Sequence, residues 1–441
     1  MSDLTEKIQY YRQHWFVRNV AVLQVGSFAG TVFQAATGIF IARILQPELF
    51  GVYSLSIGLA SLIGLLLGAG MQDAVATLVG SAYAKNSEEE LRDALAFLLK
   101  ITFYAGIATL AVFFFVPSIA RHFYDNPSIG WYAGIVLLGV FISSSFNAVV
   151  QLGLQVAGKI KTLSLIVFGD QFLRSGLSLF FVFLGFGVVG GVSGQFAGAA
   201  AIFICSVLIW AGFKRNHNIF PSLRDLFHRM GRVSVKKYLG FSLWVALDRN
   251  MGNLYMALPV VLTGIYVSTG EVSFFKLAFG YLNLVLSLLG PISVLLNMEF
   301  PKMQVQDANK LKSSFIKISI FGLIISTVLT LGAVAVSSIT FKILYGESFM
   351  PSVNYVLGLV IYGALFGIGV GLGPMWRALN KVKTSILINL VTLGIGIPVG
   401  LYLIKTFGLW GSVIMVTLWF TVSHFTSFIY LVRKLKELPK S

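Results

Sequence analysis

Long apolar segments alternate with short polar ones along the whole chain. Each apolar segment is long enough to cross a bilayer, which takes about 20 helical residues. The expected spans are residues 18–44, 50–80, 93–117, 129–154, 163–185, 188–211, 239–265, 273–298, 314–339, 351–375, 384–404 and 408–432. The pattern therefore predicts an all-α polytopic membrane protein with twelve transmembrane helices.

The longest water-compatible stretch, residues 212–238, lies near the middle of the chain. It carries seven Lys and Arg residues against a single acid, Asp225. A basic run of this kind is typical of a cytoplasmic loop. It predicts two six-helix bundles, residues 1–211 and 239–432, joined by a basic linker and followed by a cytoplasmic tail, residues 433–441.

The two predicted bundles resemble each other in sequence. The motif GKIKT at 158–162 recurs as NKVKT at 380–384, and FGVVG at 186–190 recurs as FGLWG at 407–411. A nearly constant offset indicates an internal repeat. Because each half has six spans, the two repeats run in the same direction, which is one of the known designs of transporters.

The basic residues define a topology. Of the 33 Lys and Arg residues, 25 fall on the side that includes the amino terminus, whereas the opposite loops hold only Arg43, Arg121, Lys342 and Lys405. The positive-inside rule therefore places both termini in the cytoplasm. The net charge of +16 reflects this topology and attraction to anionic membrane lipids, and it requires no nucleic acid as a partner.

The composition argues against most enzymes. Only 11% of the residues are charged, the single cysteine has no partner in the sequence, and the five histidines lack the spacing of metal ligands. No phosphate-binding glycine loop follows a strand-like run, so ATP-driven transport within this chain is not expected. We expect neither an enzyme nor a bound metal or other cofactor. A coupling proton or sodium gradient remains open.

Ionisable side chains inside predicted spans are candidates for function because they are costly in a bilayer. Asp170 and Arg174 in the fifth span are four residues apart, so they lie on one helix face and can pair. Both a structural ion pair and a role in a substrate cavity stay open for them.

A second group of candidates lies in the seventh span. Asp248 and Arg249 are adjacent and cannot pair within one helix, and Asn250 and Asn253 follow them. This pattern favours the wall of a substrate cavity over a clasp between helices. Arg249 has no acid three or four positions away in its own helix.

The first span carries a polar stripe at helical spacing, formed by Gln24, Ser27, Thr31 and Gln34. At the repeat offset, Ser27 and Thr31 correspond to positions 249 and 253, so the first helix of each half would present equivalent faces. Close helix packing is the alternative, since small polar residues also favour it. The two glutamines favour the cavity.

Several segments resemble one family. Residues 41–53, IARILQPELFGVY, are similar to the segment that joins the first two spans of bacterial oligosaccharide flippases, the Wzx or polysaccharide-transport group of the MOP superfamily. Residues 247–249, 269–272 and 300–301 are similar to the second half of that family's pattern, whereas residues 272–275 depart from it. The resemblance implies a MOP/MATE-like fold and a cavity between the two halves that opens alternately to each side.

The resemblance also implies a substrate and a location. The substrate would be an oligosaccharide linked to undecaprenyl pyrophosphate, moved across the bacterial cytoplasmic (inner) membrane for surface polysaccharide such as O-antigen. The Arg249 guanidinium could then hold the pyrophosphate by two parallel hydrogen bonds. Membrane lipids, the polysaccharide polymerase and chain-length proteins are the expected partners. A cation-coupled multidrug exporter of the same superfamily and a membrane enzyme of glycan assembly are the alternatives.

Overall fold

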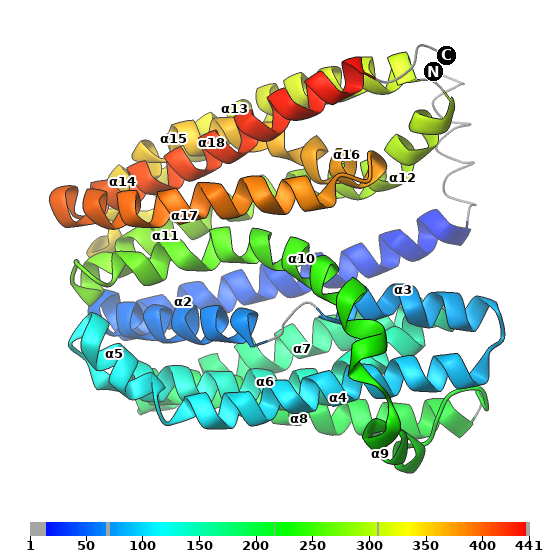
Figure 1. The fold of residues 1–441 in the computed structure, drawn as a ribbon. Helices are drawn as coiled ribbons and strands as arrows, with labels where there is room; N and C mark the ends of the chain where they lie inside the picture. The colour runs from blue at the N-terminus through cyan, green and yellow to red at the C-terminus, as the bar shows by residue number, and fades with distance from the viewer. Residues whose placement is uncertain (1–14, 68–70, 216, 307, 438–441) are drawn as a thin grey trace. The chain divides into compact units, whose positions relative to one another are not determined.

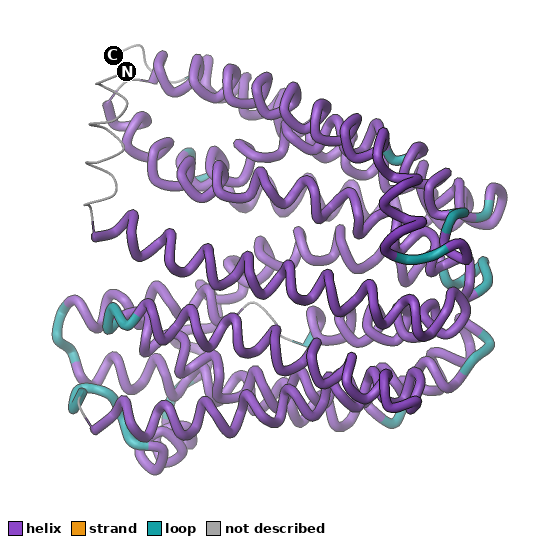
Figure 2. The backbone as a smooth tube through the Cα atoms, turned by 180° about the vertical axis from the view of Figure 1, so that it is seen from behind, coloured by secondary structure: helices purple, strands orange, loops and turns teal. Residues whose placement is uncertain are grey.

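The fold consists of helices joined by short turns (Figure 1). The computed structural model describes residues 15–67, 71–215, 217–306 and 308–437. Figure 2 shows the same helices from behind, and no strand occurs among the described residues. The prediction of an all-α protein is confirmed.

By their internal contacts, the residues form two compact units. The first unit contains Met1–Ile44 and Leu59–Asn250, and the second contains Leu45–Gly58 and Met251–Ser441. The basic segment thus groups with the first unit, and a short piece of the amino-terminal half groups with the second. The predicted bundle boundaries, which follow the repeat in the sequence, stay a prediction.

The helices of the first unit follow the predicted spans closely. They are α2 (Trp15–Leu66, apart from the piece in the second unit), α3 (Met71–Ala84), α4 (Glu88–Phe113), α5 (Val116–Tyr124), α6 (Pro127–Val156), α7 (Ile160–Phe181), the π-helical turn η1 (Val182–Phe186), α8 (Gly187–Arg215), α9 (Leu223–Arg232) and the start of α10 (Val235–Thr263). Helix α6 packs against α4 and α8, and α7 packs along α8. Helices α5 and α9 were not predicted, because both are too short to appear as apolar spans.

The core of the first unit includes part of the basic segment. Trp210 and Phe220 are fully buried and their rings meet edge to face, with centroids 5.8 Å apart. The Trp210 indole N–H donates to the Pro221 carbonyl at 3.1 Å. Leu226 of α9 is also fully buried, so the segment predicted as a basic linker is folded onto the first unit.

The second unit contains the α2 piece, the part of α10 from Met251 onward and all later helices. The later helices are α11 (Thr269–Leu286), the 3₁₀ turn η2 (Ser287–Leu289), α12 (Gly290–Gln306), α13 (Ala308–Leu344), η3 (Glu347–Phe349), α14 (Ser352–Gly358), α15 (Val360–Phe366), η4 (Gly367–Gly371), α16 (Leu372–Ala378), α17 (Val382–Phe407) and α18 (Leu409–Lys436). Helix α18 packs along α17 and also contacts α15 and α16.

Several predicted spans are interrupted. Helix α2 breaks at Gln46, whose φ of 60° is left-handed, immediately before Pro47. The predicted span 351–375 is bent by 56° between Glu347–Gly358 and Val360–Ala378. Hydropathy does not report such breaks, because it registers apolar length and not the direction of the chain.

The number of crossings is consistent with a multi-pass membrane protein. Among the described residues, eight helical stretches are long and apolar enough to cross a membrane, or nine when the bent pair is counted as one. Two of these stretches, Val22–Leu66 and Ile160–Arg215, span 45 and 56 residues, more than twice the length that one crossing needs. Both contain a break, at Gln46 and at Gly185. The exact number of twelve stays a prediction.

The sequence repeat has a counterpart in the backbone. Gly158 and Asn380 are both left-handed, with φ of 70° and 54°, and the amide of the next residue donates five positions back in each half, at 2.8 and 2.9 Å. This pattern is a Schellman motif. Gly187 and Gly408 share φ of 57° with ψ of −140° and −135°. Two repeated sequence motifs therefore make the same turns in both halves.

Candidate functional site

The first unit holds an ion pair in the apolar length of α7. The Arg174 Nε donates to the Asp170 Oδ1 at 2.7 Å, as the four-residue spacing predicted. Arg174 also donates from a terminal nitrogen to the Ser143 hydroxyl of α6. The two charged side chains retain 18% and 22% of their exposure, so the pair is only partly enclosed.

Close packing of α8 on α7 fixes the backbone that carries this pair. A Cβ atom on Gly198 would lie 2.5 Å from the Arg174 Cα, and one on Gly194 would lie 2.3 Å from the Ser178 Cα. The Ser178 hydroxyl donates to the Gly191 carbonyl at 2.8 Å. Glycines let the two backbones approach closely. This contact fixes the position of the main chain from which the Arg174 side chain extends.

A row of polar side chains on α6 continues from the ion pair. Ser143, Asn147 and Gln151 follow one another at steps of four residues and so lie on one face. The Asn147 Oδ1 accepts from the Ser206 hydroxyl at 3.2 Å, and the Gln151 Oε1 accepts from the Gln72 amide at 3.1 Å. Sequence reasoning missed this row, although its regular spacing was a visible signal.

The predicted polar stripe of α2 lies in the same unit. Ser27, Thr31 and Gln34 are exposed, and Gln24 is half-buried. The Thr31 hydroxyl donates to the carbonyl of Ser27 in its own helix at 3.1 Å. The exposed side chains leave this face of α2 open.

Helix α2 contacts α7 through glycines that alternate with the stripe. The Ser164 hydroxyl of α7 donates to the Val22 carbonyl at 2.9 Å, and a Cβ atom on Gly26 would lie 2.0 Å from the same hydroxyl. A Cβ on Gly30 would lie 3.1 Å from Gln171, the residue that follows Asp170. The structure thus brings the neighbourhood of the ion pair against the helix that carries the stripe.

The α10 candidates have different surroundings. Asn250 is buried and its amide donates to the Leu65 carbonyl at 3.1 Å. Asp248 is half-buried and Asn253 is exposed. The Arg249 side chain lies outside the described residues, so its phosphate-binding role stays a prediction.

The second unit has a neutral counterpart of the ion pair. At the repeat offset of 222 residues, Asp170 and Arg174 correspond to Thr392 and Gly396 of α17. The Thr392 hydroxyl donates to the Ile388 carbonyl of its own helix at 2.8 Å. The ionised pair at this repeat position therefore belongs to the first unit.

Outside the apolar lengths, helix α9 is held by charges. Its cap is reciprocal: the Ser222 hydroxyl accepts from the Asp225 amide, and hydrogen bonds from the Ser222 hydroxyl and main chain lower the pKa of the Asp225 carboxyl. Arg229 pairs with Asp93 of α4 at 2.8 Å. The Lys100 ammonium donates to the carbonyl of Val233, directly after α9, at 2.9 Å. These contacts tie the basic segment to α4.

The described residues do not form a metal-binding site. No three His, Cys, Asp or Glu side chains among them come close enough together to hold an ion. Asp170 and Arg174 form a partly exposed ion pair within the apolar length of α7.

Comparison with known proteins identifies relatives of sequence and of fold. A family model described as polysaccharide biosynthesis protein matches residues 40–354. No curated protein matches the chain. An inward-facing multidrug resistance MATE family transporter of the MOP superfamily is similar at 18% identity, covering 92% of this chain and 96% of that one, with a TM-score of 0.72.

Two further solved structures have the same fold. An outward-facing MATE family transporter of the MOP superfamily is 18% identical over 98% of this chain and 99% of that one, with a TM-score of 0.65. The lipid II flippase MurJ, in an inward closed conformation, is 15% identical over 93% of this chain and 87% of that one, with a TM-score of 0.67. At these identities the likeness concerns the fold, and it confirms the prediction of a MOP/MATE-like architecture.

Proposed function

Because the chain belongs to the polysaccharide biosynthesis family and has the fold of MOP-superfamily transporters, we propose that it is a flippase for a lipid-linked oligosaccharide. The substrate is a glycan on undecaprenyl pyrophosphate, and the protein moves it from the cytoplasmic to the outer leaflet of the bacterial cytoplasmic membrane. Both termini lie in the cytoplasm. The polysaccharide polymerase and chain-length proteins then use the flipped units.

The main structural support for this proposal is the partly exposed Asp170–Arg174 pair. An ionised side chain at mid-bilayer costs at least about 2.5–3.5 kcal/mol unless it is paired or wetted. A purely structural pair would be expected to be sealed in the helix packing, but these side chains keep 18% and 22% of their exposure. We infer that this exposure leaves room for water or a polar substrate beside the pair.

The chemistry of the pair suits an anionic glycolipid. A guanidinium has five N–H donors, and Arg174 directs one to Asp170 and another to Ser143. Its other donors can bind phosphate oxygens by charge-assisted hydrogen bonds. Asp170 and Ser143 hold the plane of the guanidinium, which positions these donors.

Hydroxyl and amide groups supply contacts for the sugar. The exposed Ser27, Thr31 and Gln34 of α2 offer donors and acceptors that match sugar hydroxyls. A hydrated glycan could cross the hydrocarbon region only along such a polar surface, because unsatisfied polar groups are costly in lipid. Transport would proceed by alternating access, in line with the inward-facing and outward-facing structures of the same fold.

A deletion strain tests the function. Without the protein, lipid-linked repeat units should accumulate on the cytoplasmic leaflet while their synthesis continues, and surface glycan should disappear. Leaflet location can be measured by adding a membrane-impermeant glycosidase to intact spheroplasts and to opened membranes.

The alternatives predict different results. Normal surface glycan together with lost resistance to cationic drugs would identify a multidrug exporter. Absence of the lipid-linked unit itself would identify an enzyme of glycan assembly. Either result would refute the flippase.

A further inference from the structure

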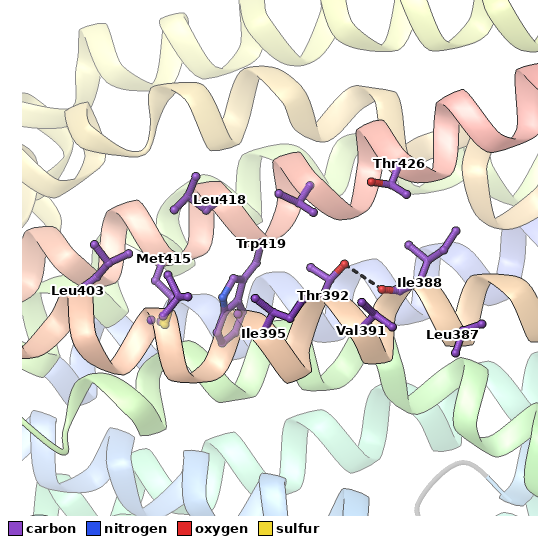
Figure 3. A pocket seen from close by; sticks show the side chains of 14 residues that line it. Leu387, Ile388, Val391, Thr392, Ile395, Leu403, Met415, Leu418, Trp419 and Thr426 are labelled. Atoms are coloured by element: carbon purple, nitrogen blue, oxygen red, sulfur yellow. Dashed lines mark hydrogen bonds between the residues drawn. The ribbon is translucent and has the colours of Figure 1, made fainter.

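An apolar groove runs along the second unit between α17 and α18 (Figure 3). Its volume is about 440 Å³. Two threonines supply its polar side chains, and one of them, Thr392, turns its hydroxyl to the Ile388 carbonyl of its own helix. The groove therefore offers an almost wholly apolar surface.

The walls of the groove are exposed ridges. The ridge on α17 consists of four side chains spaced four residues apart. Their exposures lie between 44% and 65%: Leu387, Val391, Ile395 and Val399. On α18 the opposite ridge includes Leu418 and Val422, at 43% and 49% exposure. Both ridges border a floor that is almost closed to solvent.

Two large side chains create the floor. Trp419 and Met415 of α18 point toward α17 (Figure 3), and they are 3% and 0% exposed. A Cβ atom on Gly396 would lie 2.4 Å from the Trp419 Nε1, and one on Gly400 would lie 2.4 Å from the Met415 Sδ. The glycines thus make room for bulky groups from the facing helix.

The repeat explains why this pair of helices is grooved. At the repeat offset of 222 residues, Gly396 and Gly400 correspond to Arg174 and Ser178 of α7, and the glycines of that helix pair lie on the facing helix instead. Gly194 and Gly198 of α8 meet the main chain of α7 there. Two backbones touch there, whereas Trp419 and Met415 stand between the helices of the second pair. The main chains of α17 and α18 meet only farther along, where a Cβ atom on Gly411 would lie 2.1 Å from the Leu403 carbonyl oxygen, and the groove lies along the part of the seam that the large side chains fill.

The groove is longer than one leaflet of the bilayer is thick. From Leu387 to Leu403, sixteen helical steps of 1.5 Å give a groove about 24 Å long. One leaflet of a hydrocarbon core about 30 Å thick measures only about 15 Å. The groove therefore runs past the middle of the bilayer, and a polyprenyl chain is long enough to follow it from one end to the other.

Positive charge lies at one end of the groove. Lys383 precedes Leu387 by one turn on the same face of α17, and Arg433 follows Thr426 by two turns on the same face of α18. Both side chains are exposed. At the other end, Lys405 follows Leu403 by two residues and so points to the opposite side of α17. Among these three described side chains, Lys383 and Arg433 lie at the end of the groove where a phosphate at the head of the apolar chain could be placed.

We propose that this groove binds the polyprenyl chain of the lipid-linked substrate, with its phosphate near Lys383 and Arg433. The proposal rests on the flippase function. It places the tail outside the helix bundle, on the surface of the second unit, while the polar part of the substrate is handled elsewhere.

Binding of undecaprenyl phosphate, a probe without glycan, tests the proposal. Purified protein in nanodiscs that contain phosphatidylglycerol would be titrated with the probe, and bound lipid would be counted by native mass spectrometry. Val391→Trp should fill the groove and weaken binding about tenfold, since small changes of fit in an apolar pocket have effects of this size. Leu390→Trp is the matched control, because Leu390 is equally exposed on α17 but lies outside the groove.

Each outcome has a meaning. Equal binding by the two variants, or displacement of the probe by phosphatidylglycerol at equal concentration, would overturn the proposal. If Val391→Trp is recovered in smaller amounts than the control, Val422→Trp on the opposite ridge replaces it and must show the same loss. The deletion strain tests the proposed function separately. If the groove binds the probe but deletion of the protein leaves glycan export intact, the flippase function is refuted and the lipid-binding groove is not.

Discussion

Neutralising Asp170 and Arg174 one at a time and then together separates their structural and functional roles. Arg174→Ala leaves a carboxylate in the apolar length of α7, and Asp170→Asn leaves a guanidinium there. Breaking a fully buried pair costs about 3–5 kcal/mol, and an unpaired charge at mid-bilayer costs at least about 2.5–3.5 kcal/mol. Because the two side chains are about one-fifth exposed, we expect each single change to cost about 2–3 kcal/mol.

The double variant Asp170→Asn/Arg174→Gln removes both charges and keeps hydrogen-bonding groups of similar size, and Arg174→Gln alone completes the double-mutant cycle. Two independent changes would cost about 4–6 kcal/mol together, whereas the double variant should cost only about 1 kcal/mol, so the coupling energy between the two sites should be about 3–5 kcal/mol. Ser143→Ala removes a single hydrogen bond to Arg174 and should cost about 1 kcal/mol.

Stability is measured as membrane abundance and as the thermal unfolding of the solubilised protein, and function is measured as surface glycan. The exposed pair Lys342–Glu347, with an N–O distance of 2.9 Å and side chains 66% and 74% exposed, is the control. Lys342→Ala should change stability by less than about 1 kcal/mol, because exposed pairs contribute little.

We expect the double variant to be abundant but unable to export glycan, because it has no guanidinium for the pyrophosphate. Full export by the double variant would refute the substrate role of the pair. Wild-type abundance of Arg174→Ala would refute its structural role.

Three other predictions concern topology, the second candidate arginine and the α9 cap. Reporter fusions after residues 212–238 and at Ser441 should both report the cytoplasm, and an external signal from either would remove the repeat argument as well. Arg249→Ala should abolish export at unchanged abundance while Arg249→Lys keeps part of it, since lysine has the charge without the bidentate fork; normal export would eliminate the phosphate-binding role. Asp225→Asn should lower hydrogen-exchange protection of α9 roughly twofold above pH ~4, the ordinary carboxyl pKa range. The pKa of the Asp225 carboxyl is lowered in the folded protein, so the extra protection of wild-type α9 should vanish as the pH falls through that lowered pKa. A difference in protection that persists in stronger acid would exclude the Asp225 carboxylate as the cause.

Local features of the sequence predicted local features of the structure well. The Asp170–Arg174 pair follows from a four-residue spacing within one helix, and the matched turns at Gly158 and Asn380 follow from two copies of a short motif. In each case the partners lie within a few residues, so helical geometry alone determines whether they meet.

Contacts between distant residues could not be read from the sequence. Ser143 meets Arg174 across 31 residues, and Trp419 reaches Gly396 across 23, because glycines let helices approach or admit a large side chain. Apolar composition fixes which segments enter the membrane, but it is nearly uniform around most of these helices and does not say which faces meet. The docking of α9 was missed for a related reason: its charges indicated a loop, whereas one buried leucine and an ion pair to Asp93 hold it in place.

The piece Leu45–Gly58, which groups with the second unit, has a consequence for how the protein is made. Gly51 lies against the main chain of Thr269, and Phe50 meets Phe349 edge to face with centroids 6.2 Å apart. A ribosome that adds about 5–20 residues per second needs roughly 15–60 s to make the 300 or so residues that separate Phe50 from its partner. During that time the piece must wait in the membrane without its final neighbours. Insertion of the early helices and completion of the second unit are therefore separate events, and chaperones or the insertion machinery have a defined interval in which to hold the nascent chain.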